Sequence, residues 1–263
     1  MLIDPLTARI EGIAFWANGL PSWADAQAFV ANGALPENAA TKPSPQLLPP
    51  NERRRAPESV AVALDVALAA CTMANRDPAT LPSVFASTHG DLSITDYMCA
   101  TLADDPRAVS PTKFHNSVHN AAAGYWTIGA GCMRAATAIS AYDASFAEGM
   151  IDALAQLADG ADAVLLVGYD TGATGPLRSV HACTGLLGGA LVLSRADANA
   201  SGPWMTVSLG DGEASAPGAL GRHAGGNAMA PMLPLFDALA ARAPRAALHA
   251  GPGRALLLEF AYD

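Results

Sequence analysis

The chain has 263 residues, of which 51% are hydrophobic and 15% are charged, and its formal net charge is −9. Low charge with this much apolar content excludes a disordered protein. The lack of an apolar run of roughly 18 residues excludes a transmembrane helix, and the acidic balance argues against nucleic-acid binding. A mean hydropathy of +0.22 is high for a chain without a membrane span, and it indicates a permanent protein partner.

Nothing at the N-terminus resembles a secretory signal, so we expect a cytoplasmic protein. The four cysteines form no C-x-x-C pair and no zinc-site spacing; they are Cys71, Cys99, Cys132 and Cys183. We expect them to be buried, unpaired thiols. Neither a dinucleotide fingerprint nor a phosphate-binding loop occurs, so no cofactor is predicted.

Strands and helices alternate in the N-terminal part of the chain. Hydrophobic periodicity and capping residues predict these elements: a strand at 10–16, a helix at 23–31 capped by Ser22, a proline-rich loop at 33–50, a helix at 59–73, a strand at 84–88, and a helix at 93–102 capped by Ser93.

The alternation continues to the C-terminus. The predicted elements are a helix at 116–128, a strand at 136–142, a helix opened by a Ser145–Glu148 capping box, strands at 163–169, 187–193 and 204–209, an irregular segment at 211–231, a helix at 233–242 and a strand at 255–262. This order predicts an α/β fold in which helices cover a mixed or parallel sheet.

Residues 114–170 carry the most specific pattern. An Asn-x-x-Ala-Gly-x-x-x-Ile helix precedes a strand, a turn, a second helix and a Gly-x-x-Asp unit leading into a buried strand. The matching residues are Asn120, Ala123, Gly124, Ile128, Ile139, Ser145, Gly160 and Gly168. The pattern resembles the nucleophile region of β-ketoacyl synthases, the condensing enzymes of the thiolase fold, and the resemblance extends over roughly residues 8–195.

The resemblance implies a thiolase-like, layered α/β/α architecture in a single domain of residues 1–263. Residues 1–196 correspond to the N-terminal half of a β-ketoacyl synthase. Residues 197–263 are too few for the family's second half, so we expect a reduced remnant there. His223-Ala-Gly-Gly-Asn is a weak match to one of the family's two catalytic histidine motifs.

The position of the family's nucleophilic Cys holds Asp143, or Tyr142 if the alignment slips by one residue. A carboxylate is a weak nucleophile toward a thioester, and a tyrosine phenol is almost fully protonated at neutral pH. Cys132 lies eleven residues before Asp143, beyond the intervening strand. The resemblance therefore predicts no catalytic residue, and Asp143 is well suited to capping the following helix.

A condensing scaffold without its thiol resembles the chain-length-factor subunits of polyketide systems, most closely those of the aryl polyene and xanthomonadin type. The resemblance implies a heterodimer with a full-length, active ketosynthase whose acyl tunnel this chain helps to shape, and contact with an acyl carrier protein only through that partner. The candidate interface and tunnel residues are Phe114, His115, Asn116, His119, Asn120, Tyr142, Asp143 and Phe146.

Two other functions remain open. The chain could be a stand-alone acyltransferase or thioesterase that uses Asp143, His115 or His223, or it could be a homodimeric acyl-binding module. His115 and His119 have the spacing of two metal ligands on one helical face, but no third ligand is evident and no metal site is predicted.

Two further features have ordinary explanations. His181 and Cys183 are two residues apart, and such close sequence neighbours seldom converge as a nucleophile pair. The basic run at 53–55 is most simply a solvated helix entry, since an acidic chain would repel an acidic carrier protein.

Overall fold

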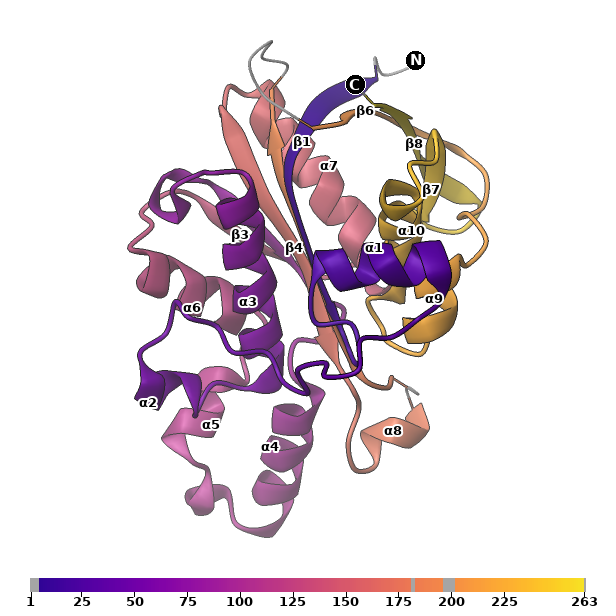
Figure 1. Cartoon of the computed structure of the whole chain (residues 1–263). Helices are drawn as coiled ribbons and strands as arrows, with labels where there is room; N and C mark the ends of the chain where they lie inside the picture. The colour runs from indigo at the N-terminus through magenta and orange to yellow at the C-terminus, as the bar shows by residue number, and fades with distance from the viewer. Residues whose placement is uncertain (1–4, 181–182, 196–201, 263) are drawn as a thin grey trace.

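The computed structural model describes residues 5–180, 183–195 and 202–262 (Figure 1). Its strands are β1 (Leu6–Ala17), β2 (Ser83–Ala86), β3 (Ala136–Ile139), β4 (Ala163–Thr171), β5 (Leu186–Ser194), β6 (Trp204–Asp211), β7 (Arg245–His249) and β8 (Arg254–Ala261). Its α-helices are α1 (Trp23–Asn32), α2 (Pro50–Arg53), α3 (Glu58–Met73), α4 (Leu92–Asp104), α5 (Pro111–Asn116), α6 (Ala121–Ala130), α7 (Ser145–Ala158), α8 (Leu177–Val180), α9 (Ala219–Ala224) and α10 (Leu233–Ala240). No helix within these described ranges is long and apolar enough to cross a membrane.

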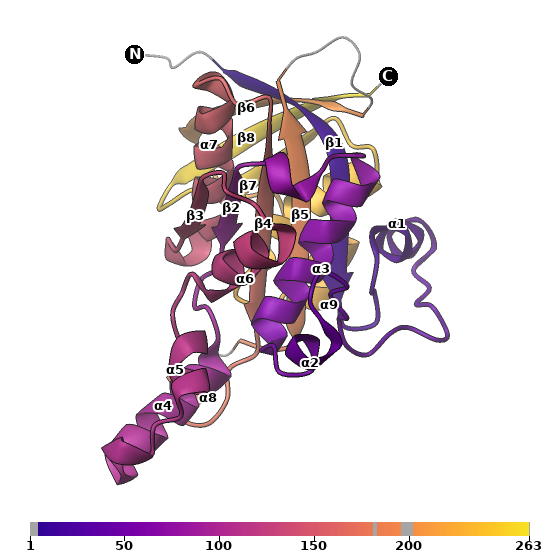
Figure 2. The same cartoon turned by 90° about the vertical axis from the view of Figure 1, so that its left-hand side faces the viewer.

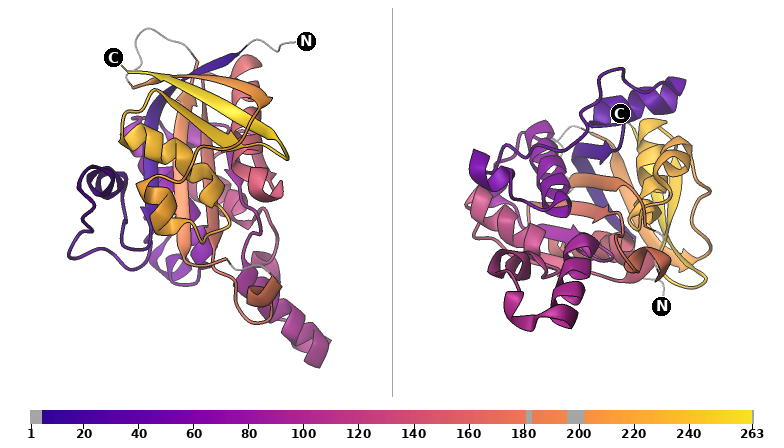
Figure 3. Two further views of the ribbon diagram at one scale, coloured as in Figure 1. Left: turned by 90° about the vertical axis from the view of Figure 1, so that its right-hand side faces the viewer. Right: turned by 90° about the horizontal axis from the view of Figure 1, so that it is seen from below.

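The strands of the described residues form one sheet in the order β3-β2-β4-β5-β1-β6-β8-β7. β2 is parallel to β3 and β4, and the other neighbouring strands are antiparallel. The sheet twists so far that β6, β8 and β7 run across the direction of β4 and β5 (Figure 3, left).

The strand order is mirrored about the β1–β6 pair. Each half has a first strand (β1 or β6), a helix (α7 or α10) and then an antiparallel hairpin (β4–β5 or β7–β8). The last strand of each hairpin returns to pair with the first strand of its own half. Within the described ranges the second half has no counterpart of β2 and β3, as expected for a shortened second half. The predicted boundary at residue 196 lies outside the described residues.

Helices cover both faces of the sheet, which confirms the layered α/β/α prediction. α3 and α6 pack on one face, and α7 and α10 pack on the other (Figure 1). Because side chains alternate along a strand, Phe15 of β1 enters the core beneath α7 and α10 whereas Trp16 enters the core beneath α3 and α6. Figure 2 shows α4 and α5 projecting from this body.

Several local predictions are wrong for identifiable reasons. The helix predicted at 116–128 begins later, since α6 starts at Ala121, and Asn116 is instead the last residue of a separate helix, α5. Asp91, not Ser93, caps α4, since its carboxylate accepts a hydrogen bond from the Ile94 amide at 3.0 Å. Cys99 is exposed on the projecting α4, whereas the other three cysteines are buried.

Two elements were not predicted in the C-terminal region. The segment at 211–231, expected to be irregular, contains α9, and β7 lies where no strand was expected. Both elements are short, so neither offers enough residues for a clear periodic signal.

Candidate functional site: the turn between β3 and α7

The backbone makes an unusual turn between β3 and α7. Tyr142 has φ of 53°, in the left-handed region that non-glycine residues rarely adopt. It begins a 3₁₀ turn, Tyr142–Ala144, that leads directly into α7. This turn lies at the position where the sequence aligns with the family's nucleophile.

Two hydroxyl groups hold the turn. The Ser145 hydroxyl donates to the Tyr142 carbonyl at 2.6 Å and accepts from the Ala141 amide at 2.9 Å. The Thr88 hydroxyl lies 3.3 Å from the same carbonyl. The predicted Ser145–Glu148 capping box is therefore wrong: the N-cap is Ala144, and the Ser145 hydroxyl is engaged with the preceding turn.

A buried carboxylate lies beneath this turn. Asp170, near the end of β4, accepts hydrogen bonds from the Ser87 hydroxyl at 2.7 Å and from the Thr88 amide at 2.8 Å, and the His89 amide is 3.3 Å away. Burial raises the pKa of Asp170 to about 6, although these hydrogen bonds act to lower it. Asp170 is not among the residues predicted from the sequence, yet an acidic residue near the end of an otherwise apolar buried strand is a recognisable signal.

The shortened second half reaches the same place. The Asn227 amide nitrogen donates to the Asp170 carbonyl at 3.1 Å, and its oxygen accepts from the Met229 amide. The Thr88 hydroxyl also lies 3.4 Å from the Ala228 carbonyl. Thr88 therefore lies between the β3–α7 turn and the segment that precedes α10.

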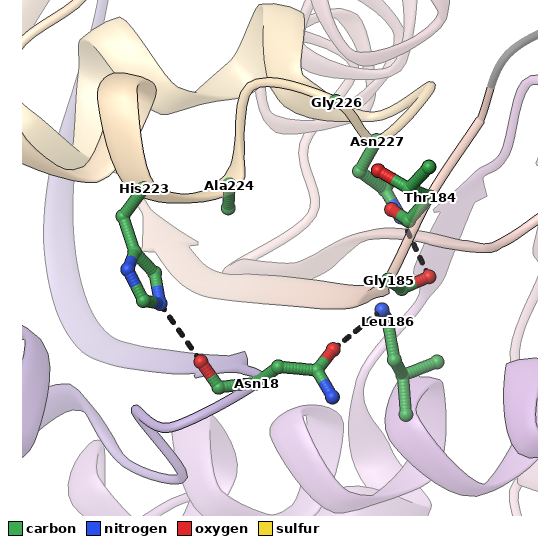
Figure 4. Close-up of a pocket in the computed structure, with 8 residues that line it drawn as sticks. All are labelled: Asn18, Thr184, Gly185, Leu186, His223, Ala224, Gly226 and Asn227. Atoms are coloured by element: carbon green, nitrogen blue, oxygen red, sulfur yellow. Dashed lines mark hydrogen bonds between the residues drawn. The ribbon is translucent and has the colours of Figure 1, made fainter.

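Asn227 also lines a small pocket of about 150 Å³ (Figure 4). Its lining includes His223, whose Nε2 is 2.8 Å from the Asn18 carbonyl and so donates to it. The Asn18 side chain in turn accepts from the Leu186 amide at 2.8 Å. Backbone partners thus hold both side chains, and among the described residues no acidic group lines this pocket.

The predicted interface and tunnel residues fall into two groups. Phe114, His115, Asn120, Tyr142 and Asp143 are exposed. The others are buried or half-buried and serve the fold: Asn116 accepts from the Tyr125 hydroxyl, His119 Nε2 donates to the Ser87 carbonyl at 2.8 Å, and Phe146 packs against Phe236.

The side chains proposed for a stand-alone enzyme have separate surroundings. Asp143 makes no hydrogen bond or ion pair within the described part of the chain. The His115 ring lies against Tyr125, and His223 contacts Asn18 and Phe29. His181 lies outside the described residues. Within those residues no three His, Cys, Asp or Glu side chains are grouped as metal ligands.

Several large apolar side chains are exposed near the β3 end of the sheet. β3 pairs only with β2, so its outer edge has no strand partner among the described residues. On α6 and in the segments leading to β3 and α7 these exposed side chains are Ile128, Met133 and Tyr142; Phe114 and Val118 are also exposed, on the projecting α5 and in the segment after it. Ile128 is 81% exposed and Met133 is 96% exposed. We call Ile128, Met133, Tyr142 and the free edge of β3 the β3-end surface.

Solved structures with the same fold come from condensing-enzyme complexes. The chain superimposes with a TM-score of 0.76 and 22% identity on a chain of the Xenorhabdus doucetiae ketosynthase ApeO in complex with its chain length factor ApeC, covering 97% of this chain and 99% of that one. A chain of the type II polyketide synthase complex AntDE:AntF gives a TM-score of 0.76 at 12% identity, covering 98% and 100%. The ishigamide ketosynthase/chain length factor gives 0.66 at 16% identity, covering 78% and 67%.

Comparison with curated protein sequences finds no match. The family model of the β-ketoacyl synthase N-terminal domain matches residues 22–209, which is more than half of the chain. The turn between β3 and α7, the mirrored halves of the sheet and this match agree with one another. The chain therefore belongs to the β-ketoacyl synthase family.

Proposed function

We propose that this chain is a non-catalytic, chain-length-factor-like subunit that forms a heterodimer with an active β-ketoacyl synthase. In this proposal the partner carries the nucleophile and receives the acyl carrier protein. The chain supplies part of the wall of the acyl tunnel, in a pathway of the polyketide or aryl polyene type.

The observation that carries the proposal is the β3–α7 turn. The fold retains the strand, the turn and the helix, but Tyr142 and Asp143 stand where condensation needs a thiol. Two of the similar solved structures are described as a ketosynthase together with a chain length factor, which supports a subunit role over an independent enzyme.

The β3-end surface supports the same proposal. Exposed apolar side chains are ordinary when scattered, but here several large ones flank a strand edge that is open to further pairing. A partner that covers this surface would remove apolar area from water, which stabilises the complex by about 25 cal/mol for each Å² buried.

Co-expression with candidate ketosynthases, followed by size-exclusion chromatography, tests the proposal. We expect a stable complex with one of them, and we expect Ile128→Asp to abolish it because a carboxylate would be buried against apolar groups. Leu209→Asp is the matched control, since Leu209 is an exposed leucine on β6, which is separated from β3 by four strands of the sheet. A chain that stays a well-folded monomer with every candidate would contradict the proposal.

The stand-alone acyltransferase or thioesterase has no comparable support. No contact among the described residues joins Asp143 to a histidine with which it could form an acid–base pair. Acyl turnover by the isolated chain, lost in Asp143→Asn, would favour that alternative.

A further inference from the structure

Three non-glycine residues of the described chain have positive φ, and two of them have a simple explanation. Asn75 and Arg242 come directly after the C-cap residues of α3 and α10, where a left-handed residue commonly ends a helix. Tyr142 precedes a helix instead, so helix termination does not account for its conformation.

The conformation of Tyr142 is held by the residues around it. Its carbonyl faces the hydroxyls of Ser145 and Thr88, and Thr88 is anchored in turn by Asp170. Strain that the surroundings enforce, rather than relieve, is a feature of functional positions. A tight turn from a strand into a helix is also the general device by which folds present a nucleophilic side chain.

The turn presents the Tyr142 side chain outward. Tyr142 is 59% exposed, and its ring makes an edge-to-face contact with the His89 ring, with the two centroids 6.4 Å apart. Asp143 follows within the 3₁₀ turn, has ordinary backbone geometry and makes no hydrogen bond to described residues. The two candidates for the nucleophile position are therefore not equivalent.

We propose that Tyr142, not Asp143, stands in the nucleophile position, so that this subunit presents an aromatic ring where the family presents its thiol. The assignment itself rests on the fold and the family. Its consequence, that the acyl chain is never attached to this subunit, rests on the proposed function.

Cysteine substitution tests the assignment. Tyr142→Cys and Asp143→Cys are compared in a Cys99→Ser background, because Cys99 is the exposed native thiol among the described residues. The probe is iodoacetamide: the thiolate attacks the methylene carbon, a C–S bond forms, and the C–I bond breaks with release of iodide. Tyr142 lies three residues before the first residue of α7, in the turn rather than in the helix. A thiol in the family's nucleophile position has a lowered pKa, so the assignment predicts that Tyr142→Cys reacts about five- to tenfold faster than Asp143→Cys near pH 7.

The same reaction in guanidinium chloride is the control for intrinsic reactivity, and there we expect the two rates to become equal. Equal rates in the folded proteins, or a faster reaction of Asp143→Cys, would overturn the assignment. Circular dichroism shows whether each variant is folded. Because the reaction needs no partner, its outcome is independent of whether a ketosynthase complex forms.

Discussion

Replacing Asp170 by asparagine isolates the contribution of the buried carboxylate to the pH dependence of stability. Two effects oppose each other at this residue: burial disfavours the charged form, while the Ser87 hydroxyl and the Thr88 and His89 amides favour it. If burial dominates, the pKa rises from 3.8 in the unfolded chain to about 6 in the folded protein. The folded state then binds the proton more tightly than the unfolded state.

The sign of the effect follows from proton linkage. A raised folded-state pKa means that this group stabilises the fold fully below about pH 4 and that this stabilisation is lost as the pH rises through about 6. A shift of about two units corresponds to about 3 kcal/mol, since one unit is worth about 1.4 kcal/mol. Asparagine resembles the protonated form and does not titrate.

Urea unfolding of both proteins between about pH 4 and pH 7 measures this term directly. The other carboxylates titrate alike in the two proteins, so they cancel in the difference. We expect the free energy of unfolding of the wild type, minus that of Asp170→Asn, to fall by about 2.5 kcal/mol across this range, because part of the full effect of about 3 kcal/mol is already lost at pH 4. A difference that rises with pH would refute the reasoning, because the hydrogen bonds would then outweigh burial.

Two further predictions concern backbone geometry. Gly12→Ala should destabilise the fold by roughly 2–3 kcal/mol in urea unfolding, because a Cβ there would overlap the carbonyl oxygen of Ala70 on α3. Gly124→Ala on α6 is the control and should be neutral or stabilising, because the space around that Cβ is open. Equal effects of the two substitutions on the free energy of unfolding would contradict this packing argument. Tyr142→Gly should be more stable than Tyr142→Ala by about 1 kcal/mol, because glycine adopts the left-handed conformation without cost. The opposite order would show that the turn relaxes once the ring is removed.

The sequence is most informative where elements are long and periodic. The strand at 163–169 and the helix from Ser145 both form where their patterns predict them. Local capping is less predictable because neighbouring polar residues compete: Asp91 and Ser93 are both good N-caps, and the register of α4 decides between them. β7 depends on pairing with β8, which no local pattern reports.

The candidate site shows a similar division. The motif predicts the nucleophile position within one residue, and our proposal of Tyr142 over Asp143 rests on a backbone angle that the sequence does not encode locally. Asp170 and Asn227 contact each other only because β4 and the segment before α10 meet at the end of the sheet. Such long-range hydrogen bonds follow from topology and are invisible to periodicity.

The mirrored sheet also indicates where a partner can bind. In the first half, the outer face of β4, β5 and β1 is covered by α3 and carries apolar side chains such as Leu165 and Val192. The corresponding outer face of the second half carries charged groups, with Arg245 of β7 and Glu259 of β8 paired at 3.1 Å and both side chains largely exposed to solvent. A partner or helix that covered this face would remove these two charges from water, which costs considerable free energy.

The shortened second half therefore needs no further layer over its outer face, although a full-length second half would be expected to bring one. Its inner face is already filled, because alternate residues of β8 such as Leu256 and Leu258 pack into the core beneath α7 and α10. The β3-end surface differs, because large apolar side chains flank an open strand edge there. If the chain pairs with a ketosynthase, the partner should meet it at the β3-end surface, next to the turn that presents Tyr142.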